Sequence, residues 1–548
     1  MRHTLLYTLL MASLLAVPAR WAKAQEETRE ALLHINKPFY VTGEVIWYQL
    51  YLPATLKGQL FTLKATLLDE QGQAADVSFI SSKGLPFCQG YYFIPYNLPS
   101  GMYRLWFTAT TEGGALHTLA MGAVPIYNDL QPLPKDIPAS EVAATPTQPA
   151  GVLAVRIEME SALPLRPRQP LRLRVWVQGQ SGEPVDAWGS LSIRDEQLCG
   201  KKVMAGATLF SGLPIAAAQR YRSGINWPGS VVDEEGAPLK TPLLGVIGVD
   251  DGRLLFTKAD KEGKFLLTLP EYSGQQRWQF IDHAAPGLKV QWEHPTPPAP
   301  APPLAYTQGI LDYLSYSRQR KKIYQLYAAQ ETPLASTDAD QMNALPGWEP
   351  TFSYIVPNYE RFPDMATFFQ EVVPMVRFPE RRNGFAVTLY NPASQDYFSA
   401  PPLFIIDGKA TRDASFVAAL NPAYVEQVDL LTSPSQLRAY YPAIGAGGVI
   451  RIRTNLPSLI LPEDQEDDIF SLPGMQPVAG FPAQDKDLNL PALRPAVLWL
   501  PALQVQSEDG ATVSLLHSDD YGEFCIEVVV QSEDGRRGSG RYCYSVER

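Results

Sequence analysis

The segment Pro401–Asn455 constrains the fold more than any other part of this chain of 548 residues. It opens with an apolar run, Leu403–Ile406, that stops at Asp407-Gly408, a pair suited to a tight turn because glycine lacks a Cβ. A short helix-like piece, a strand-like run and a glycine-rich bend follow. In the last stretch, Val449–Thr454, apolar side chains alternate with arginines. These patterns predict a small α+β domain.

In order and chemistry, this segment resembles the plug domain of the TonB-dependent outer-membrane receptors. That family's pattern is an IDG turn, an LNP turn before a strand, and a glycine-rich loop that leads into a strand ending in I-x-I-x-T. The simpler alternative is a glycine turn followed by an ordinary β-strand. The positions that carry the resemblance here are Ile406, Asp407, Gly408, Leu420, Asn421, Pro422, Val425, Glu426, Tyr441, Gly445, Gly447, Gly448, Val449, Ile450, Ile452 and Thr454.

The chain departs from a complete receptor after this segment. A receptor plug is followed by a barrel of many strands, each about ten residues long with alternating apolar and polar side chains. Only 94 residues follow Thr454, and the first of them are Pro-rich and acidic. We therefore expect a plug-like unit without a pore of its own, and a function other than transport through this chain.

Composition predicts the rest of the architecture. The chain has 49 prolines and 39 glycines against 19% charged residues, which favours many turns and short strands over helix bundles. Apolar residues make up 45%, enough for several cores. The expected fold class is a mainly β, multidomain protein of immunoglobulin-like sandwiches with one small α+β domain.

Residues 1–24 have the pattern of a secretory signal peptide: a charged start at Arg2, an apolar run Leu5–Val17, and Ala22-Lys23-Ala24 as a cleavage site. Its removal takes away three cations and no acids, so the formal charge moves from −11 to −14. An acidic exported chain is a poor candidate for binding nucleic acid, because phosphate affinity needs clustered Lys and Arg. We expect a mature chain that is peripheral to the membrane at most, in the periplasm or at the outer membrane of a Gram-negative bacterium.

Four cysteines lie in the exported part, where disulfides persist. Cys525 and Cys543 flank the turn-forming run Ser532–Gly538 almost symmetrically, so we predict that they face each other across a hairpin as a disulfide. Cys88 and Cys199 fall in separate predicted domains and are expected to be single buried thiols.

Three further stretches resemble known β-domains. Residues 25–130, with Pro38-Phe39-Tyr40, Gly43-Glu44 and the strand Leu98–Trp106, resemble the macroglobulin-type sandwich of the alpha-2-macroglobulin family, as does the run GEPVDAWGSLSIRDEQL within 151–222. Residues 223–293 resemble the carboxypeptidase regulatory-like fold, which implies a structural spacer without catalysis. The predicted domains are completed by a plug-like domain at 351–456, a sandwich-like unit at 495–548, and linkers at 131–150, 294–350 and 457–494. This order resembles a group of exported multidomain proteins from Bacteroidetes.

The linker at 294–350 contains one helix candidate, Tyr306–Tyr327, with apolar residues at helical spacing. We expect its basic residues to form an ordinary solvated face; the alternative is a contact for lipid head groups or an acidic partner. These residues are Arg318, Arg320, Lys321 and Lys322.

Motifs for catalysis are missing from the sequence. The six histidines lack metal-binding spacing, and there is no nucleophile elbow, Walker loop or paired CxxC. Neither Cys88 nor Cys199 stands in the C-x-E-Q order of a thioester protease trap. The pairs Asp250-Asp251 and Asp519-Asp520 offer oxygens for Ca²⁺, but they also suit plain turns. We predict a protein that is not an enzyme, with no catalytic, metal-binding or cofactor-binding residues and no cofactor.

The resulting hypothesis is an exported interaction or scaffold protein that binds an envelope protein, for example an outer-membrane barrel, through the loops Asp407–Arg412 and Tyr440–Gly448. A second hypothesis is an accessory ligand-binding component of TonB-dependent nutrient uptake, with a pocket among Trp47, Tyr103 and Trp106. A third is a relative of macroglobulin protease inhibitors, for which the stretch 132–149 would be the cleavable segment.

Overall fold

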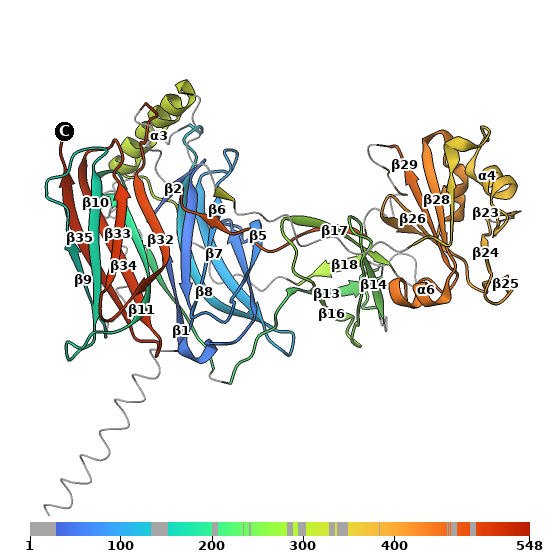
Figure 1. The fold of residues 1–548 in the computed structure, drawn as a ribbon, viewed down its shortest axis with the longest axis horizontal. Helices are drawn as coiled ribbons and strands as arrows, with labels where there is room; N and C mark the ends of the chain where they lie inside the picture. Colours follow the sequence, from blue (N-terminus) through green and yellow to red (C-terminus); the bar gives the residue numbers. More distant parts are fainter. Residues whose placement is uncertain are drawn as a thin grey trace, which may run out of the picture. The chain divides into compact units, whose positions relative to one another are not determined.

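The computed structural model divides the chain into two compact units (Figure 1). The first comprises residues 1–223, 295–339 and 475–548, and the second comprises residues 224–294 and 340–474. The signal-like residues 1–24 and nearly all of the linker 131–150 lie outside the described part. The structure describes residues 29–132, 152–199, 207–216, 218–233, 235–239, 243–281, 289–293, 303–327, 335–336, 349–382, 384–456, 459, 461, 468–482 and 489–548.

An N-terminal sandwich opens the first unit. Its two sheets have the strand orders β12-β1-β3-β6 and β2-β8-β7-β4-β5, and apolar side chains from both fill the space between them. β7 and β8 form the longest hairpin, with ten residues in β7 all buried. The strands are β1 (Glu30–Ile35), β2 (Tyr40–Val41), β3 (Val45–Tyr51), β4 (Thr62–Leu68), β5 (Ala74–Ser81), β6 (Phe87–Phe93), β7 (Gly101–Thr110), β8 (Leu116–Tyr127) and β12 (Leu209–Pro214), with a 3-10 turn η1 (Ala54–Leu56).

A composite sandwich follows, built from segments more than 300 residues apart. Its sheets have the orders β33-β10-β9 and β32-β11-β34-β35, around one apolar core. Alternating apolar and polar residues in β10 give the pattern of a half-buried strand. The strands are β9 (Ala154–Met159), β10 (Pro170–Gln178), β11 (Ala187–Asp195), β32 (Ala496–Val505), β33 (Ala511–Leu516), β34 (Gly522–Ser532) and β35 (Arg537–Val546).

This arrangement contradicts two of the predicted domain boundaries. Residues 151–222 and 495–548 were expected to form two separate units, but β11 has both of its neighbours, β32 and β34, from the C-terminal segment. In addition, β12 lies in the predicted second sandwich by sequence, yet it pairs with β1 of the N-terminal sandwich. The physical reason is that each segment alone leaves a strand with unpaired main-chain edges, and the distant segment satisfies them.

A middle β-domain begins the second unit. Its sheets have the orders β16-β13-β18 and β15-β14-β17-β30. β30 comes from the predicted linker 457–494, so that this stretch supplies a strand and is not only a tether. The strands are β13 (Ile225–Val232), β14 (Leu244–Gly248), β15 (Leu254–Thr257), β16 (Lys264–Leu269), β17 (Gln275–Ile281), β18 (Lys289–Trp292) and β30 (Ile469–Pro473).

A mixed domain, residues 349–456, completes the second unit. Its main sheet has the order β20-β28-β29-β26-β27, with β26 parallel to β29 and the other pairs antiparallel. Helices α4 and α5 contribute to the core on one face of this sheet, and Asp364 and Asp413 cap their N-termini. The elements are β20 (Phe352–Ile355), η2 (Val356–Asn358), α4 (Met365–Val372), β21 (Val376–Arg377), β22 (Glu380–Arg381), β23 (Gly384–Phe385), β24 (Thr388–Asn391), β25 (Asp396–Tyr397), β26 (Leu403–Ile406), β27 (Lys409–Thr411), α5 (Ala414–Ala419), η3 (Pro422–Tyr424), β28 (Val425–Leu431), α6 (Pro434–Tyr440) and β29 (Val449–Thr454).

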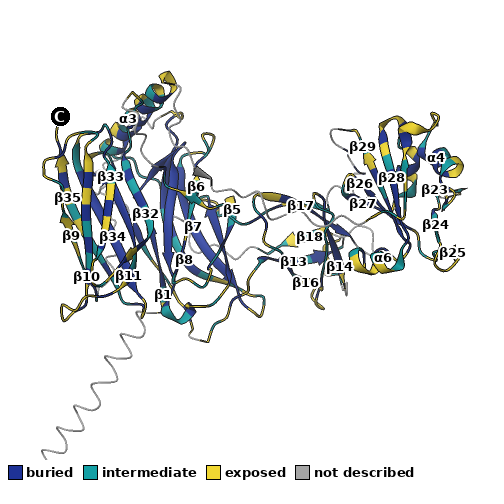
Figure 2. Ribbon diagram, in the orientation of Figure 1, coloured by how far each residue is buried: buried dark blue, intermediate teal, exposed yellow. Residues whose placement is uncertain are grey.

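Helix α3 (Gln308–Leu326) packs on the first unit. Thr307 caps its N-terminus. Ile310, Tyr313 and Leu314 are buried in a cluster with residues of β2 and β8, and Figure 2 shows both buried and exposed residues along the helix. The remaining described elements are α2 (Glu196–Cys199), β19 (Ala335–Ser336) and β31 (Ala479–Gly480), the last two paired with each other.

The fold is therefore mainly β and multidomain, with several sandwiches and one mixed domain. Among the described helices, none is both long and apolar enough to cross a membrane.

Candidate functional site

The glycine and aspartate residues singled out in the mixed domain hold its strands together. The carboxylate of Asp407 accepts a hydrogen bond of 2.8 Å from the main-chain N–H of Thr454, which ties the turn after β26 to the end of β29. Gly408 has φ of +86°, and a Cβ there would lie 1.9 Å from the carbonyl oxygen of Val249 in the middle β-domain. Only glycine fits this turn.

The other motif residues also have local structural causes. Asn421 accepts a hydrogen bond of 2.9 Å from the N–H of Ala423 and so caps the turn η3, in which Pro422 takes the first position. Gly448 has φ of +83° at the entry to β29. A Cβ at Gly447 would lie 2.1 Å from the carbonyl oxygen of Pro401, and one at Gly445 would lie 2.8 Å from Cβ of Tyr441.

The loops 407–412 and 440–448, predicted to bind a partner, are largely engaged within the second unit. Ala410, Tyr441 and Ile444 are buried in one apolar cluster that also contains Ile247 of β14. The side-chain amide of Gln279 in β17 donates to the carbonyl of Ala410 at 2.8 Å and accepts from its N–H at 2.7 Å. These loops join the mixed domain to the middle β-domain, which leaves little of them for another protein.

The open edge of the mixed domain lies at β20. This strand pairs with β28, and the described sheet carries no strand on its other side. Ile355 at the end of β20 is 52% exposed, and Tyr359 and Tyr424 are exposed to 42% and 49%. Because β20 and β28 run antiparallel, the end of β20 and the start of β28 lie at the same end of the sheet. From the sequence, we predicted that a partner binds the motif loops. The open edge at β20 could not be predicted, because the order of strands in the sheet decides which strand is outermost.

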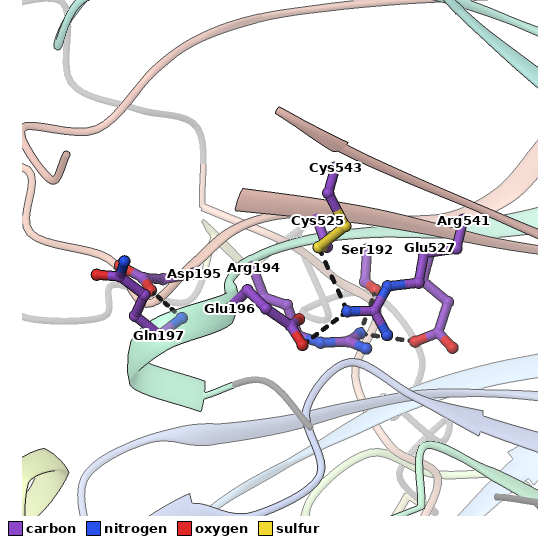
Figure 3. Close-up of a disulfide and its surroundings, with 9 residues drawn as sticks. All are labelled: Ser192, Arg194, Asp195, Glu196, Gln197, Cys525, Glu527, Arg541 and Cys543. Atoms are coloured by element: carbon purple, nitrogen blue, oxygen red, sulfur yellow. Dashed lines mark hydrogen bonds and ion pairs between the residues drawn. A yellow bond between two sulfur atoms is a disulfide. The ribbon is translucent and has the colours of Figure 1, made fainter. Parts of the chain in front are cut away.

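The predicted disulfide partners are joined. Cys525 and Cys543 stand opposite each other in the β34–β35 hairpin, and their sulfurs are bonded (Figure 3). The guanidinium of Arg541 lies 3.3 Å from the sulfur of Cys525 and forms a 2.6 Å ion pair with Glu196. Cys88 and Cys199 are free and buried.

Ser190, His34 and Glu527 meet where the two sandwiches of the first unit pack together. Nδ1 of His34 lies 2.7 Å from the hydroxyl of Ser190, and its Nε2 lies 4.0 Å from Glu527, an order that resembles a serine hydrolase triad. Three observations argue against hydrolysis. Ser190 and His34 have no exposed surface. The Ser190 hydroxyl also contacts that of Tyr51 at 2.7 Å. The same oxygen of Glu527 is bound by Arg194 at 2.7 Å.

Electrostatics support this structural role. Burial lowers the pKa of His34 to about 4, so the ring is neutral at ordinary pH although Glu527 acts in the opposite sense. For Glu527, burial favours the neutral acid, but Arg194 and His34 outweigh it and lower its pKa to about 2. His34, Ser190 and Glu527 therefore form a buried polar contact that holds the two sandwiches together. No local sequence signal marks it, because its members come from β1, β11 and β34.

A second buried ionic cluster holds α3 in place and contradicts the prediction that its basic residues are simply solvated. Arg320 of α3 is 3% exposed and lies 3.1 Å from Glu44. The other oxygen of Glu44 is 2.5 Å from the ammonium of Lys37, and the hydroxyl of Tyr313 donates to Glu44 at 2.5 Å. Burial favours the neutral form of Glu44, but Lys37 and Arg320 lower its pKa to about 2.

Asp129, just beyond β8, binds two other cations of the helix, Arg318 and Lys321. Lys321 contacts both of its carboxylate oxygens at 2.8 Å, and Ser317 donates to it at 3.0 Å. Arg318 donates to its main-chain carbonyl at 2.6 Å. The expected basic patch is thus mostly committed to carboxylates and carbonyls of the same unit, supplied by residues about 190 to 280 positions away in sequence.

A small pocket of about 60 Å³ opens beside this cluster. Its lining comes from β3, α3, residues 481–482 and residues 493–496 of the first unit. Trp47 and Phe481, whose ring centroids are 5.7 Å apart, belong to its apolar lining. Its charged lining residues are Lys37, Glu44, Arg320 and Arg494.

The aromatic residues predicted to share one pocket do not gather. Trp47 lines the pocket described above, whereas Tyr103 belongs to the core between the sheets of the N-terminal sandwich. Trp106 is buried and donates to Thr118 of the neighbouring strand at 2.9 Å.

The acidic pairs considered for Ca²⁺ have arginine partners. Asp250 contacts Arg277 at 2.6 Å and Asp519 contacts Arg168 at 2.6 Å. Within the described residues, the one group of potential metal ligands is Glu523, Cys525 and Cys543, and both of its sulfurs are consumed by the disulfide.

Among comparisons with known proteins, only the search of solved structures found similar chains. No protein-family model and no curated protein matches this sequence. A Salmonella alpha-2-macroglobulin mutant covers 95% of this chain at 11% identity with a TM-score of 0.23. Trypsin-activated alpha-2-macroglobulin from Escherichia coli covers 95% at 10% identity with a TM-score of 0.23. A tetra-tandem repeat of a large adhesion protein covers 94% at 9% identity with a TM-score of 0.14 and is itself matched over 99% of its length. The chain spans 40% and 42% of the length of the two macroglobulins.

Proposed function

We propose that this chain is a non-enzymatic, exported interaction protein of the Gram-negative envelope. Its sandwiches act as a scaffold, and its mixed domain, which resembles a receptor plug in the residues quoted above, binds a protein partner. The signal-like N-terminus supports export. A disulfide in the described structure fits an oxidising compartment.

The observation that carries this proposal is the open strand edge at β20. Ile355, Tyr359 and Tyr424 expose large apolar surface at one end of the sheet, and no other described strand pairs with the outer side of β20. An extended segment of a partner can add to such an edge, with main-chain hydrogen bonds for affinity and side-chain contacts for specificity. An open strand edge flanked by exposed apolar side chains can pair with unrelated chains and aggregate. The binding of a specific partner at β20 would explain why this edge is open.

The test is site-specific photocrosslinking in outer-membrane preparations of the source bacterium. A photoreactive residue at position 355 is compared with one at position 326, where Leu326 is 83% exposed at the end of α3. We expect one outer-membrane protein to be linked from position 355 and not from position 326. Equal labelling from both positions, or none from position 355, would contradict the proposal.

A second candidate, a ligand-binding accessory of TonB-dependent uptake, is supported by one observation. The pocket beside Trp47 has a mixed lining of apolar and charged side chains, as small-molecule sites have. The protease-inhibitor alternative depends on the stretch 132–149, which falls almost wholly outside the described residues.

A further inference from the structure

The disulfide of the composite sandwich is accessible from only one of its two cysteines. Cys525 in β34 has no exposed surface, whereas Cys543, its partner in the strand pairing, is exposed on β35. A thiolate that opens a disulfide must reach the sulfur that it attacks, so access decides which cysteine reacts. The exposed Cys543 is therefore the point of attack on this bond.

The attacking thiolate has to come from another molecule. Cys88 and Cys199 are free but buried, and burial raises the pKa of both thiols, that of Cys199 to about 12. Both thiols are therefore protonated at neutral pH, and the thiolate is the form that attacks a disulfide. The two free cysteines of this chain supply no such group.

Arg541 donates a hydrogen bond to the sulfur that would leave. Its Nη2 lies 3.3 Å from Sγ of Cys525 and 2.6 Å from Glu196, and Figure 3 shows the guanidinium joined to both groups. A hydrogen bond from a cation becomes stronger when its acceptor gains charge, so this bond favours the thiolate of Cys525. A stabilised thiolate is a better leaving group.

Three carboxylates near this guanidinium oppose the same thiolate. Glu196 fixes Arg541 and offsets part of its charge. A carboxylate oxygen of Glu523 lies within 4.8 Å of both sulfurs. Glu527 stands opposite Arg541 in the strand pairing, and Arg194 binds it at 2.7 Å. These acids act on the sulfur through space, whereas Arg541 contacts it directly.

The strand pairing around the bond does not depend on the bond. β34 and β35 are paired through ten residue pairs, of which the two cysteines are one. In the next pair toward the chain's end, the rings of Phe524 and Tyr544 stack with centroids 6.0 Å apart. The two sulfurs therefore stay opposite each other after the bond opens, and the bond can close again.

We propose that this disulfide is a reversible exchange site for a small external thiol, which attacks Cys543 and releases Cys525. The external thiolate forms a bond to Sγ of Cys543, the bond between the two cysteines breaks, and its electron pair leaves on Sγ of Cys525. A second external thiolate then removes the first as a small disulfide and frees Cys543, so the external thiol is oxidised and the cysteine pair is reduced. This inference is independent of the partner proposed at β20.

Reaction of the oxidised full chain with glutathione tests the direction of attack. After an acid quench, free thiols are alkylated and peptides are analysed by mass spectrometry. Glutathione should be found on Cys543 at least about tenfold more often than on Cys525, which should carry the alkyl group. Equal adducts on both cysteines, or more on Cys525, would overturn the proposal.

Single-cysteine variants test access without the intermediate. Cys525→Ser leaves a thiol at Cys543, and Cys543→Ser leaves one at Cys525. With dithiodipyridine as the probe, the thiol at Cys543 should react at least about tenfold faster than the thiol at Cys525. Equal rates would show that burial of Cys525 does not direct the exchange.

Charge variants test the leaving group. Arg541→Gln should slow the opening of the bond by glutathione by about three- to tenfold, and Glu523→Gln should not slow it. The control is Arg536→Gln in the turn of the same hairpin, because the side chains of Arg536 and Arg541 are similarly exposed, at 34% and 32%. A hairpin that is merely loosened would open faster, so a slower rate reports on the leaving sulfur. An unchanged or faster rate in Arg541→Gln, or the same slowing in Arg536→Gln, would contradict the role of Arg541.

Discussion

At the scale of single residues, carboxylates decide how the first unit holds together. Glu44 belongs to the Y-x-x-G-E pattern visible in the sequence, yet its role depends on Arg320, 276 residues later. His34, Ser190 and Glu527 have no local pattern at all. Periodicity and turn chemistry report on neighbours in sequence, so they predict caps such as Asn421 and turns such as Gly408 but not buried pairs between distant strands.

Replacing Glu44 by glutamine should be strongly destabilising. The neutral amide would remove the buried carboxylate that Lys37 and Arg320 both contact, at a cost of about 3–5 kcal/mol. Urea unfolding of the first unit at pH 7 measures the effect. The exposed pair Arg156–Glu158 is the control, since Glu158→Gln should cost less than about 1 kcal/mol. Similar small costs for both variants would contradict the buried cluster.

Asp195 predicts a pH dependence of stability. Burial raises its pKa to about 6, from 3.8 in a model compound, so the folded state binds its proton more tightly than the unfolded state. This contribution is present in full below pH 4 and is lost as the pH rises through 6. Asparagine keeps an oxygen for the N–H groups of Gln197 and Leu198, which Asp195 binds at 2.8 and 2.9 Å.

The comparison of Asp195→Asn with the parent should therefore change with pH. Relative to the parent, the variant should gain up to about 3 kcal/mol of unfolding free energy between pH 4 and pH 7. Asp520 and Glu196 lie nearby and are present in both proteins, so the difference between the two curves isolates Asp195. A difference that stays constant across this range would refute the assignment.

At the scale of elements, local sequence patterns predicted the helices and strands whose partners are close in sequence. The strands β26 and β29, the helix α3 and the hairpin of β34 and β35 all follow from alternation, helical spacing and turn residues. The burial of α3's cations did not follow, because an arginine on a helix looks solvated until its partner strand is known. The same limit hid the open edge at β20.

The disulfide supports one of these elements. In the double variant Cys525→Ala, Cys543→Ala, the β34–β35 hairpin loses a link across a sequence separation of 18, and the first unit should lose roughly 3 kcal/mol. Thermal unfolding of the oxidised parent, the reduced parent and the variant measures this. Reduction of the parent should reproduce most of the loss, and an unchanged midpoint in both would show that the link adds no stability.

At the scale of the whole molecule, several sheets are completed by strands that are distant in sequence. β12 returns to β1, β30 joins β17, and the C-terminal segment supplies four strands of the composite sandwich. Sequence analysis predicted the mainly β class but divided the composite sandwich in two, because pairing over more than 300 residues leaves no local trace. The segments that looked like independent units or tethers complete one another's sheets.

Truncation tests whether residues 152–199 need the C-terminal strands in order to fold. Ending the chain after Arg494 removes both neighbours of β11, so residues 152–199 should become sensitive to protease, while the second unit keeps all of its own strands and stays resistant. Limited proteolysis followed by mass spectrometry separates the two regions. A truncated chain in which 152–199 remains as protected as in the full chain would show that this segment folds alone.

The proposal that the mixed domain presents β20 to a protein partner is tested most directly by hydrogen–deuterium exchange of the full chain with and without solubilised outer membranes. We predict slower exchange confined to peptides that cover residues 349–359, because an added strand would form hydrogen bonds with the outward-facing amides of β20. No change there, or protection only in other parts of the chain, would contradict the account.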